Sequence, residues 1–343
     1  MQDISDLKAR SEQGDLHAQV CIGWCYHDGR DVPKDPDKAV YWWTKAADQG
    51  NSDAQYSLGW FYLFGECILR DLNKAVYWQE KAAEQGHPVA QYNLGCFYFK
   101  GEGILRDLDK AVYWWTKAAE QGDAQAQCWL GRSYYDGEGV SKDLDKAAYW
   151  WTKAAEQSDA QAQYNLGILY NNGEGVLKNP DKAAYWWTMA ADQDNINAML
   201  KLGTYFYLKA ANLKPEFLIG QPGKNSRPVD LCMADYWLTR AAELGETSAQ
   251  FLLGAYYHNA ECGPRDIDKA IYWYSKAANQ GHVDAQLELG NCFCEREGIL
   301  KDLGRATYWW SMAAAQGNDE AKNMLKKTGK GKELATRIRS INL

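Results

Sequence analysis

The chain has 343 residues, of which 46% are hydrophobic, and it carries a formal net charge of −7. The negative net charge argues against general, non-specific binding of nucleic acid. Residues 1–15 are polar and lack the apolar core of a signal peptide, and no apolar run approaches the length that spans a membrane. We therefore expect a cytoplasmic protein, and export by a specialised secretion route stays open.

The sequence repeats with a period of 36 residues, which indicates a repeat architecture. An opening Ala recurs at this spacing from Ala18 to Ala198 and again from Ala249 to Ala321, and only the step between the two series is longer, by 15 residues. In every unit but the last, a Gly follows the opening Ala by five residues, and Tyr or Phe follows that Gly by three.

These repeats divide the chain into three parts. Residues 1–17 fit the second helix of a half-repeat and are expected to cap the N-terminal end. Residues 18–320 hold eight repeats. Residues 321–343 are expected to form a capping helix followed by a basic tail.

The first half of each unit is predicted to be a helix. In the unit that begins at Ala90, Leu94 and Tyr98 continue one face of this helix. Gly95 lies in its middle, where Gly costs about 1 kcal/mol relative to Ala. We therefore expect a neighbouring helix to approach closely at Gly95.

The second half of the same unit is predicted to be a helix that begins at Asp107, a good N-cap residue whose slot holds Asp or Asn in other units. Ala111, Trp114 and Ala118 would form its buried stripe. Gly122 would end it in the left-handed conformation.

Two units break this ending rule. Ser158 and Asp194 replace the terminal Gly, so their junctions are expected to be less relaxed.

The sixth unit carries an inserted loop at about 209–230, where Pro and Gly are dense and argue against one long helix.

The repeated pattern A-Q-x-x-L-G-x-x-Y-x-x-G-x-G-V followed by D-x-x-K-A-x-x-W-x-x-K-A-A-x-Q-G resembles the Sel1-like repeat family, relatives of tetratricopeptide repeats. The resemblance covers roughly residues 5–325. It implies an all-α fold, a right-handed superhelical α-solenoid of antiparallel helix pairs in which each unit packs mainly on its neighbours. It also implies a non-catalytic scaffold or adaptor that binds a protein or peptide.

By analogy with tetratricopeptide-like solenoids, the first helix of each pair would line the concave face. The lining positions would be three before, one after and four after the repeat Gly, and the last two vary strongly between units. Partner binding is therefore predicted at Trp24, His27, Tyr56, Trp60, Leu63, Tyr92, Cys96, Phe99, Cys128, Arg132, Tyr135, Tyr164, Ile168 and Asn171. The alternative is that these side chains merely pack against the next unit.

Tandem aromatics such as Tyr41-Trp42-Trp43 recur in the second helices. They could stack on bases or sugars, but consecutive helical residues point about 100° apart and make no flat platform. Core packing beside the Ala stripe is the favoured interpretation.

Metal and cofactor sites are not expected. Cys292 and Cys294 would point to nearly opposite sides of a helix, and the pair Cys21 and Cys25 lacks a further ligand at finger-like spacing. The nine cysteines occupy no common repeat slot, so we expect no secreted disulfide framework.

No enzyme is expected either. Residues 5–8 match S-x-x-K and residues 327–329 match K-T-G, but the S-D-N motif is absent and the two matches should lie at opposite ends of a rod. A β-lactamase-like hydrolase and a self-assembling structural element remain as alternatives. The basic tail could contact an acidic partner, a membrane surface or nucleic acid, although a solubilising cap is the simpler interpretation.

Overall fold

The structure is a computed structural model that describes residues 4–65, 70–211, 229–259, 265–295 and 302–328. All regular secondary structure in these ranges is helical, which confirms the all-α prediction. The chain divides into two compact units, residues 1–183 and residues 184–343. Each is a stack of antiparallel helix pairs and is described by itself.

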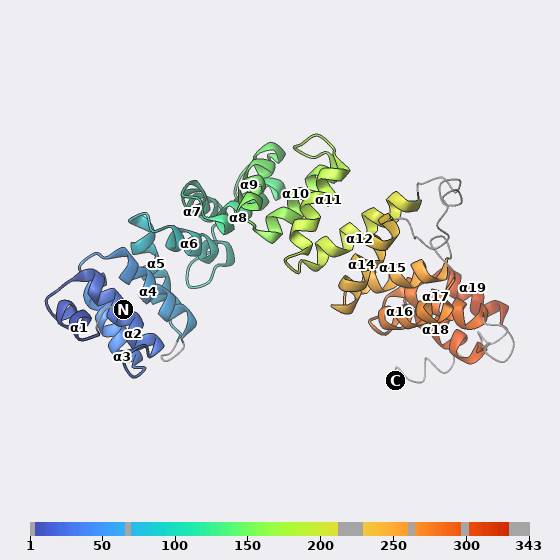
Figure 1. Cartoon of the computed structure of the whole chain (residues 1–343), viewed down its shortest axis with the longest axis horizontal. Helices are drawn as coiled ribbons and strands as arrows, with labels where there is room; N and C mark the ends of the chain where they lie inside the picture. Colours follow the sequence, from blue (N-terminus) through green and yellow to red (C-terminus); the bar gives the residue numbers. More distant parts are fainter. Residues whose placement is uncertain (1–3, 66–69, 212–228, 260–264, 296–301, 329–343) are drawn as a thin grey trace. The chain divides into compact units, whose positions relative to one another are not determined.

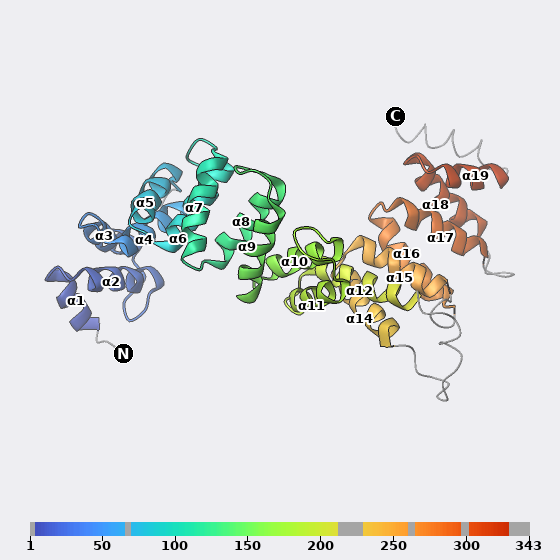
Figure 2. The same ribbon diagram turned by 90° about the horizontal axis from the view of Figure 1, so that it is seen from above.

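Consecutive helices pack on each other over residues 4–172 in the first unit and over the described residues of 196–327 in the second (Figures 1 and 2). The helices of the first unit are α1 (Ile4–Glu12), α2 (Leu16–Asp28), α3 (Pro36–Ala47), α4 (Ser52–Phe64), α5 (Leu72–Glu84), α6 (Pro88–Lys100), α7 (Leu108–Glu120), α8 (Ala124–Asp136), α9 (Leu144–Glu156) and α10 (Ala160–Asn172). Helix α11 (Pro180–Ala191) contains the boundary between the units. The second unit continues with α12 (Ile196–Ala211), α14 (Val229–Glu243), α15 (Thr247–His258), α16 (Ile267–Asn279), α17 (Val283–Glu295), α18 (Leu303–Ala315) and α19 (Asp319–Lys327).

Helix starts follow the predicted capping chemistry. The Asp107 side chain accepts a hydrogen bond from the Lys110 backbone N–H at 3.0 Å, and Asn179 does the same for Lys182 at 2.9 Å. At the starts of the first helices, Asp159 caps α10 in this way. His87 is the N-cap of α6, because its Nδ1 accepts a hydrogen bond from the Ala90 N–H at 3.2 Å.

The close approach predicted at Gly95 is present, and a Trp side chain makes it. A Cβ atom added to Gly95 would lie 2.5 Å from both Cδ1 and Nε1 of Trp115. Gly131 meets Trp151 in the same way. In these two repeats the first helix therefore rests directly on an indole of its own partner helix, and the repeat Gly makes room for that ring. The same slot faces Gln79 at Gly59, Leu238 at Gly203 and Tyr274 at Gly254.

The core interpretation of the tandem aromatics holds for only part of each triplet. Trp115 is buried, whereas Trp114, which we expected in the buried stripe, is only partly buried. The first residue of each triplet is more than half exposed, as Tyr113 illustrates. The prediction was wrong for these Tyr residues because three consecutive helical side chains span about 200° and cannot all face the same neighbour.

Ser158 adopts the strained conformation that its slot requires. Its φ is +67°, and that of Asp194 is +62°, where other units place Gly. A left-handed residue with a Cβ costs roughly 1–2 kcal/mol. We expect Ser158→Gly to raise the free energy of unfolding by about 1 kcal/mol, measured by chemical denaturation. Asp194→Gly should gain less, because Asp tolerates this region better and Asp194 accepts a hydrogen bond from Arg240 at 2.7 Å. Equal free energies of unfolding for Ser158→Gly and wild type would contradict the assignment of strain to Ser158.

The sixth repeat is more helical at its edges than predicted. Residues 209–211 continue α12, and residues 229 and 230 begin α14. The reason is burial, because Ala210 packs in a small cluster with Leu231 and Tyr256. The rest of the predicted insertion, residues 212–228, and the basic tail from residue 329 lie outside the described residues.

None of the helices in the described ranges is both long and apolar enough to cross a membrane. The cysteines that the structure describes are free thiols. They are Cys21, Cys25, Cys96, Cys128, Cys232, Cys292 and Cys294.

Candidate functional site

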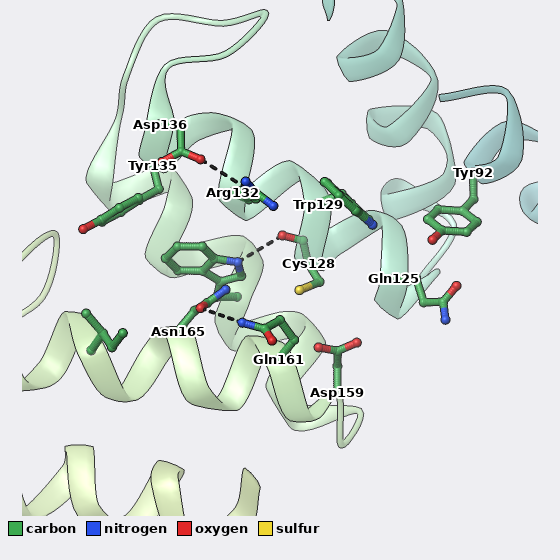
Figure 3. A pocket seen from close by; sticks show the side chains of 12 residues that line it. Tyr92, Gln125, Cys128, Trp129, Arg132, Tyr135, Asp136, Asp159, Gln161 and Asn165 are labelled. Atoms are coloured by element: carbon green, nitrogen blue, oxygen red, sulfur yellow. Dashed lines mark hydrogen bonds and ion pairs between the residues drawn. The ribbon is translucent and has the colours of Figure 1, made fainter. Parts of the chain in front are cut away.

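A hollow of about 600 Å³ opens in the first unit, where the first helices of three consecutive repeats meet around α8. We call it the α8 hollow (Figure 3). Its volume is within the range of small-molecule and side-chain pockets. Its lining residues are Tyr92 of α6, Gln125, Cys128, Trp129, Arg132, Tyr135 and Asp136 of α8, Trp151 of α9, and Asp159, Gln161, Asn165 and Ile168 at α10.

Aromatic rings form the inner walls of the α8 hollow and are held in place by neighbours. Trp129 stacks on Trp115 with ring centroids 5.2 Å apart and an interplanar angle of 19°. Trp151 donates from its Nε1 to the Cys128 carbonyl at 3.0 Å, and its ring lies 5.4 Å from that of Tyr135. These contacts make the walls rigid, so the hollow is a preformed feature of the stack.

Polar groups surround these rings, and most are paired with each other. Arg132 donates to Asp136 at 3.2 Å, and its guanidinium lies 5.4 Å from the Trp129 ring centroid. Gln161 donates to Asn165 at 3.0 Å. Figure 3 shows both pairs at the edge of the hollow. The rim is therefore polar and the interior aromatic, which is the usual make-up of a protein recognition surface.

The Cys128 thiol faces Asp159, and both groups line the hollow (Figure 3). Burial raises the pKa of this thiol, and the Asp159 carboxylate raises it further. Burial also raises the pKa of the Tyr92 hydroxyl. Both groups stay protonated at neutral pH, so Cys128 lacks the thiolate that a nucleophilic cysteine needs.

The structure brings five of the residues predicted for partner binding to this hollow. They are Tyr92, Cys128, Arg132, Tyr135 and Ile168. Leu63 and Cys96 line a second hollow of about 510 Å³, which Tyr92 shares, between α4 and α6. Tyr164 and Asn171 lie on α10 but line neither hollow.

The remaining predicted residues pack against other units. Trp24, His27 and Trp60 form one aromatic cluster, with the Trp24 ring centroid 5.9 Å from Trp60 and that of His27 5.4 Å from Trp60. The Tyr56 ring stacks on that of His87 with the ring centroids 4.7 Å apart. The ring centroids of Phe99 and Trp129 are 5.1 Å apart. These side chains contact a neighbouring unit, and partner binding by them stays a prediction.

Seven lining residues were missed by the sequence analysis. Gln125 and Gln161 stand six residues before the repeat Gly, so extending the helical period by one more turn would have found them. Trp129 and Asn165 stand two before it, at the edge of the same face. Asp136, Trp151 and Asp159 carry no such signal. Trp151 lies on a second helix, Asp159 is an N-cap, and Asp136 is the last residue of α8.

The described residues include no group of three or more His, Cys, Asp or Glu side chains that could hold a metal ion.

Comparisons with known proteins identify the repeat. The Sel1 repeat model matches residues 17–51, 52–87, 88–123, 124–159, 160–195, 196–215, 228–246, 247–282 and 283–318. No curated protein is significantly similar to the chain.

Solved structures agree with this match. A protective antigen of uropathogenic Escherichia coli strains that displays an SLR fold is 34% identical, with a TM-score of 0.84 over 95% of this chain and 67% of that one. A Sel1 repeat protein from Oxalobacter formigenes is 32% identical, with a TM-score of 0.65 over 94% of this chain and 89% of that one. Proteins with this tetratricopeptide-like fold generally mediate protein–protein interactions and are typically non-catalytic. With repeats matched along nearly its whole length, this chain belongs to the Sel1 repeat family.

Proposed function

We propose that the chain is a non-catalytic scaffold that binds a partner protein through the α8 hollow and the first-helix surface around it. The observation that carries this proposal is the hollow itself, which has fixed aromatic walls and a polar rim built from three consecutive repeats. Its lining side chains differ from those at the same slots of other repeats. The position after the repeat Gly, for example, holds Trp60, Cys96, Arg132 and Ile168 in successive units.

The chemistry of the hollow favours binding over catalysis. Cys128, its one sulfur group, is kept protonated by burial and by Asp159. Arg132 and Asp136 neutralise each other, and the amides of Gln161 and Asn165 are weak acids and bases. A surface of this kind can recognise a side chain, but it supports no proton transfer or covalent step.

Photo-crosslinking tests the location of the partner. We expect p-benzoylphenylalanine in place of Arg132 to crosslink a partner in native lysate. The matched control carries the same group in place of Tyr149, which is 54% exposed on a second helix and lines neither hollow. Equal crosslinking at both positions, or none at position 132, would contradict the proposal.

A truncation variant tests the energy of the same contact. The polar pairs of Arg132, Gln161 and Asn165 lie at the rim, and Arg132 also covers the Trp129 ring. Changing all three to Ala should alter stability by about 1 kcal/mol. We expect the variant to bind the crosslinked partner at least tenfold more weakly, measured by surface plasmon resonance. Trp60 and Phe99 are unsuitable for this test because they pack within aromatic clusters.

A further inference from the structure

The α8 hollow contains a carboxylate that has no ion-pair partner among the described residues. Its lining includes three charged side chains, Arg132, Asp136 and Asp159. Arg132 and Asp136 form an ion pair at 3.2 Å. Asp159 accepts from the Ala162 backbone N–H at 2.7 Å, and within the described part of the chain no Lys or Arg forms an ion pair with it. One carboxylate therefore faces the hollow without a cation.

The walls around this carboxylate are suited to a cation as well. Tyr92, Trp129 and Trp151 line the hollow, and aromatic rings attract cationic groups. The chain already uses its rings in this way, because the Arg132 guanidinium lies over Trp129 at 5.4 Å and the Arg106 guanidinium over Phe99 at 5.9 Å. The hollow thus combines a carboxylate with aromatic faces, the two features that recognise guanidinium and ammonium groups.

The net charge of the first unit is also negative. Residues 1–183 hold 27 Asp and Glu against 19 Lys and Arg, a net charge of −8, whereas residues 184–343 hold 18 against 19. Excess negative charge over the unit that contains the hollow attracts basic partners and accelerates their association.

We propose that the α8 hollow receives a Lys or Arg side chain from a basic segment of the partner, which places its cation against Asp159 and the surrounding aromatic rings. This inference rests on the proposed function and specifies the partner's chemistry. Asp159 is the specificity-determining group, and Tyr92, Trp129 and Trp151 enclose the aliphatic stem of the inserted side chain.

Synthetic peptides test this assignment on the full-length protein. The probes are four peptides Gly-Ser-X-Ala-Gly-Ser-X-Ala-Gly-Ser-X-Ala, with X as Arg, Lys, Leu or Glu, titrated against protein labelled with 5-fluorotryptophan and followed by fluorine NMR. Assignment of the Trp129 and Trp151 resonances comes from Trp→Phe variants. We expect the Arg and Lys peptides to shift these two resonances, and the Leu and Glu peptides to leave them unchanged.

A variant that neutralises the Asp159 side chain but keeps the helix N-cap tests the role of the carboxylate. Asp159→Asn keeps a good N-cap residue for α10 and removes the carboxylate. We expect it to weaken binding of the Arg peptide about fivefold, the equivalent of one partly exposed ion pair. Asp123→Asn makes the same change at the start of α8, where Asp123 caps the helix at 2.7 Å and does not line the hollow. This control should bind as wild type does.

The outcomes separate this inference from the proposed function. Equal binding of the Leu peptide, no shift from any peptide at millimolar concentration, or unchanged affinity of Asp159→Asn would overturn the inference. If position 132 crosslinks a partner whose crosslinked segment holds no Lys or Arg, the inference fails and the proposed function stands. If position 132 crosslinks nothing while the Arg peptide binds as expected, the proposed function fails and the hollow remains a cation site.

Discussion

Trp151→Ala is expected to lower the free energy of unfolding of the first unit by about 3–5 kcal/mol, the usual cost of removing a buried Trp. The ring is only 3% exposed. It lies against Gly131 of α8 and donates a hydrogen bond to the Cys128 carbonyl at 3.0 Å. Its loss leaves a cavity beneath α8 and removes the hydrogen bond that ties α9 to the α8 backbone. Hydrogen exchange of the α8 and α9 amides in the full-length protein would measure the loss locally.

Tyr149→Ala is the matched control, because Tyr149 belongs to the same aromatic triplet and is 54% exposed. Its ring contacts are with Trp150 and Lys153 on its own helix. Truncation of such a surface side chain usually changes stability by less than about 0.5 kcal/mol. Similar losses for Tyr149→Ala and Trp151→Ala would show that the two side chains are not on opposite sides of the helix as described.

Much of the fold could be predicted because the repeat period and the capping residues are local signals. Asp107 and Gly122 bound a helix wherever they occur in the unit, and the structure places an N-cap and a left-handed residue there. Which face of that helix is buried was harder to predict. Trp114 and Trp115 are adjacent and equally apolar, and only the position of Gly95 on the facing helix selects Trp115.

The Ala-Gln pair that opens most of the repeats shows what periodicity alone could not explain. Gln127 is buried, and it donates to the Ala119 carbonyl at 3.1 Å and accepts from Gln157 at 2.9 Å. The same geometry joins Gln91 to Gln121 at 2.8 Å. These side chains tie each first helix to the helices before and after it, a role that depends on residues 8 and 30 positions away.

The sixth repeat changes both members of the hydrogen-bonded Gln–Gln pair together. Its two slots hold Met199 and Leu244, so an apolar pair replaces the two amides. A buried amide without its partner costs about 1–3 kcal/mol, whereas replacing both partners can be nearly neutral. The joint change is therefore the one that the physics of buried hydrogen bonds permits.

The candidate site was less predictable than the fold. The analogy with related solenoids pointed to the first helices and named Arg132 and Tyr135, which line the α8 hollow, but it could not tell which units would be open. In the N-terminal units Trp24 and Trp60 fill the space between first helices. Around α8 the corresponding residues are Arg132 and Ile168, which leave the hollow accessible. Side-chain size across neighbouring repeats decides this, and a single repeat does not reveal it.

Gly95→Ala is expected to destabilise the first unit by about 2 kcal/mol, although Ala favours a helix by about 1 kcal/mol over Gly. The new Cβ would stand 2.5 Å from two atoms of the Trp115 indole, a rigid buried ring that cannot fold away. Overpacking of this kind costs about 1–3 kcal/mol and occasionally more. Hydrogen exchange of the α6 and α7 amides should report the loss.

The second repeat supplies the control for this clash. Gly59 occupies the same slot but faces Gln79, whose Cγ and Nε2 would lie 2.8 Å from the added Cβ. Because the Gln side chain has several rotatable bonds, we expect Gly59→Ala to cost less than Gly95→Ala. In a double-mutant cycle, Gly95→Ala should also cost at least about 1 kcal/mol less when Trp115 is first changed to Gln. If the cycle shows no coupling between positions 95 and 115, the Trp115 indole is not the reason that Gly is required at position 95.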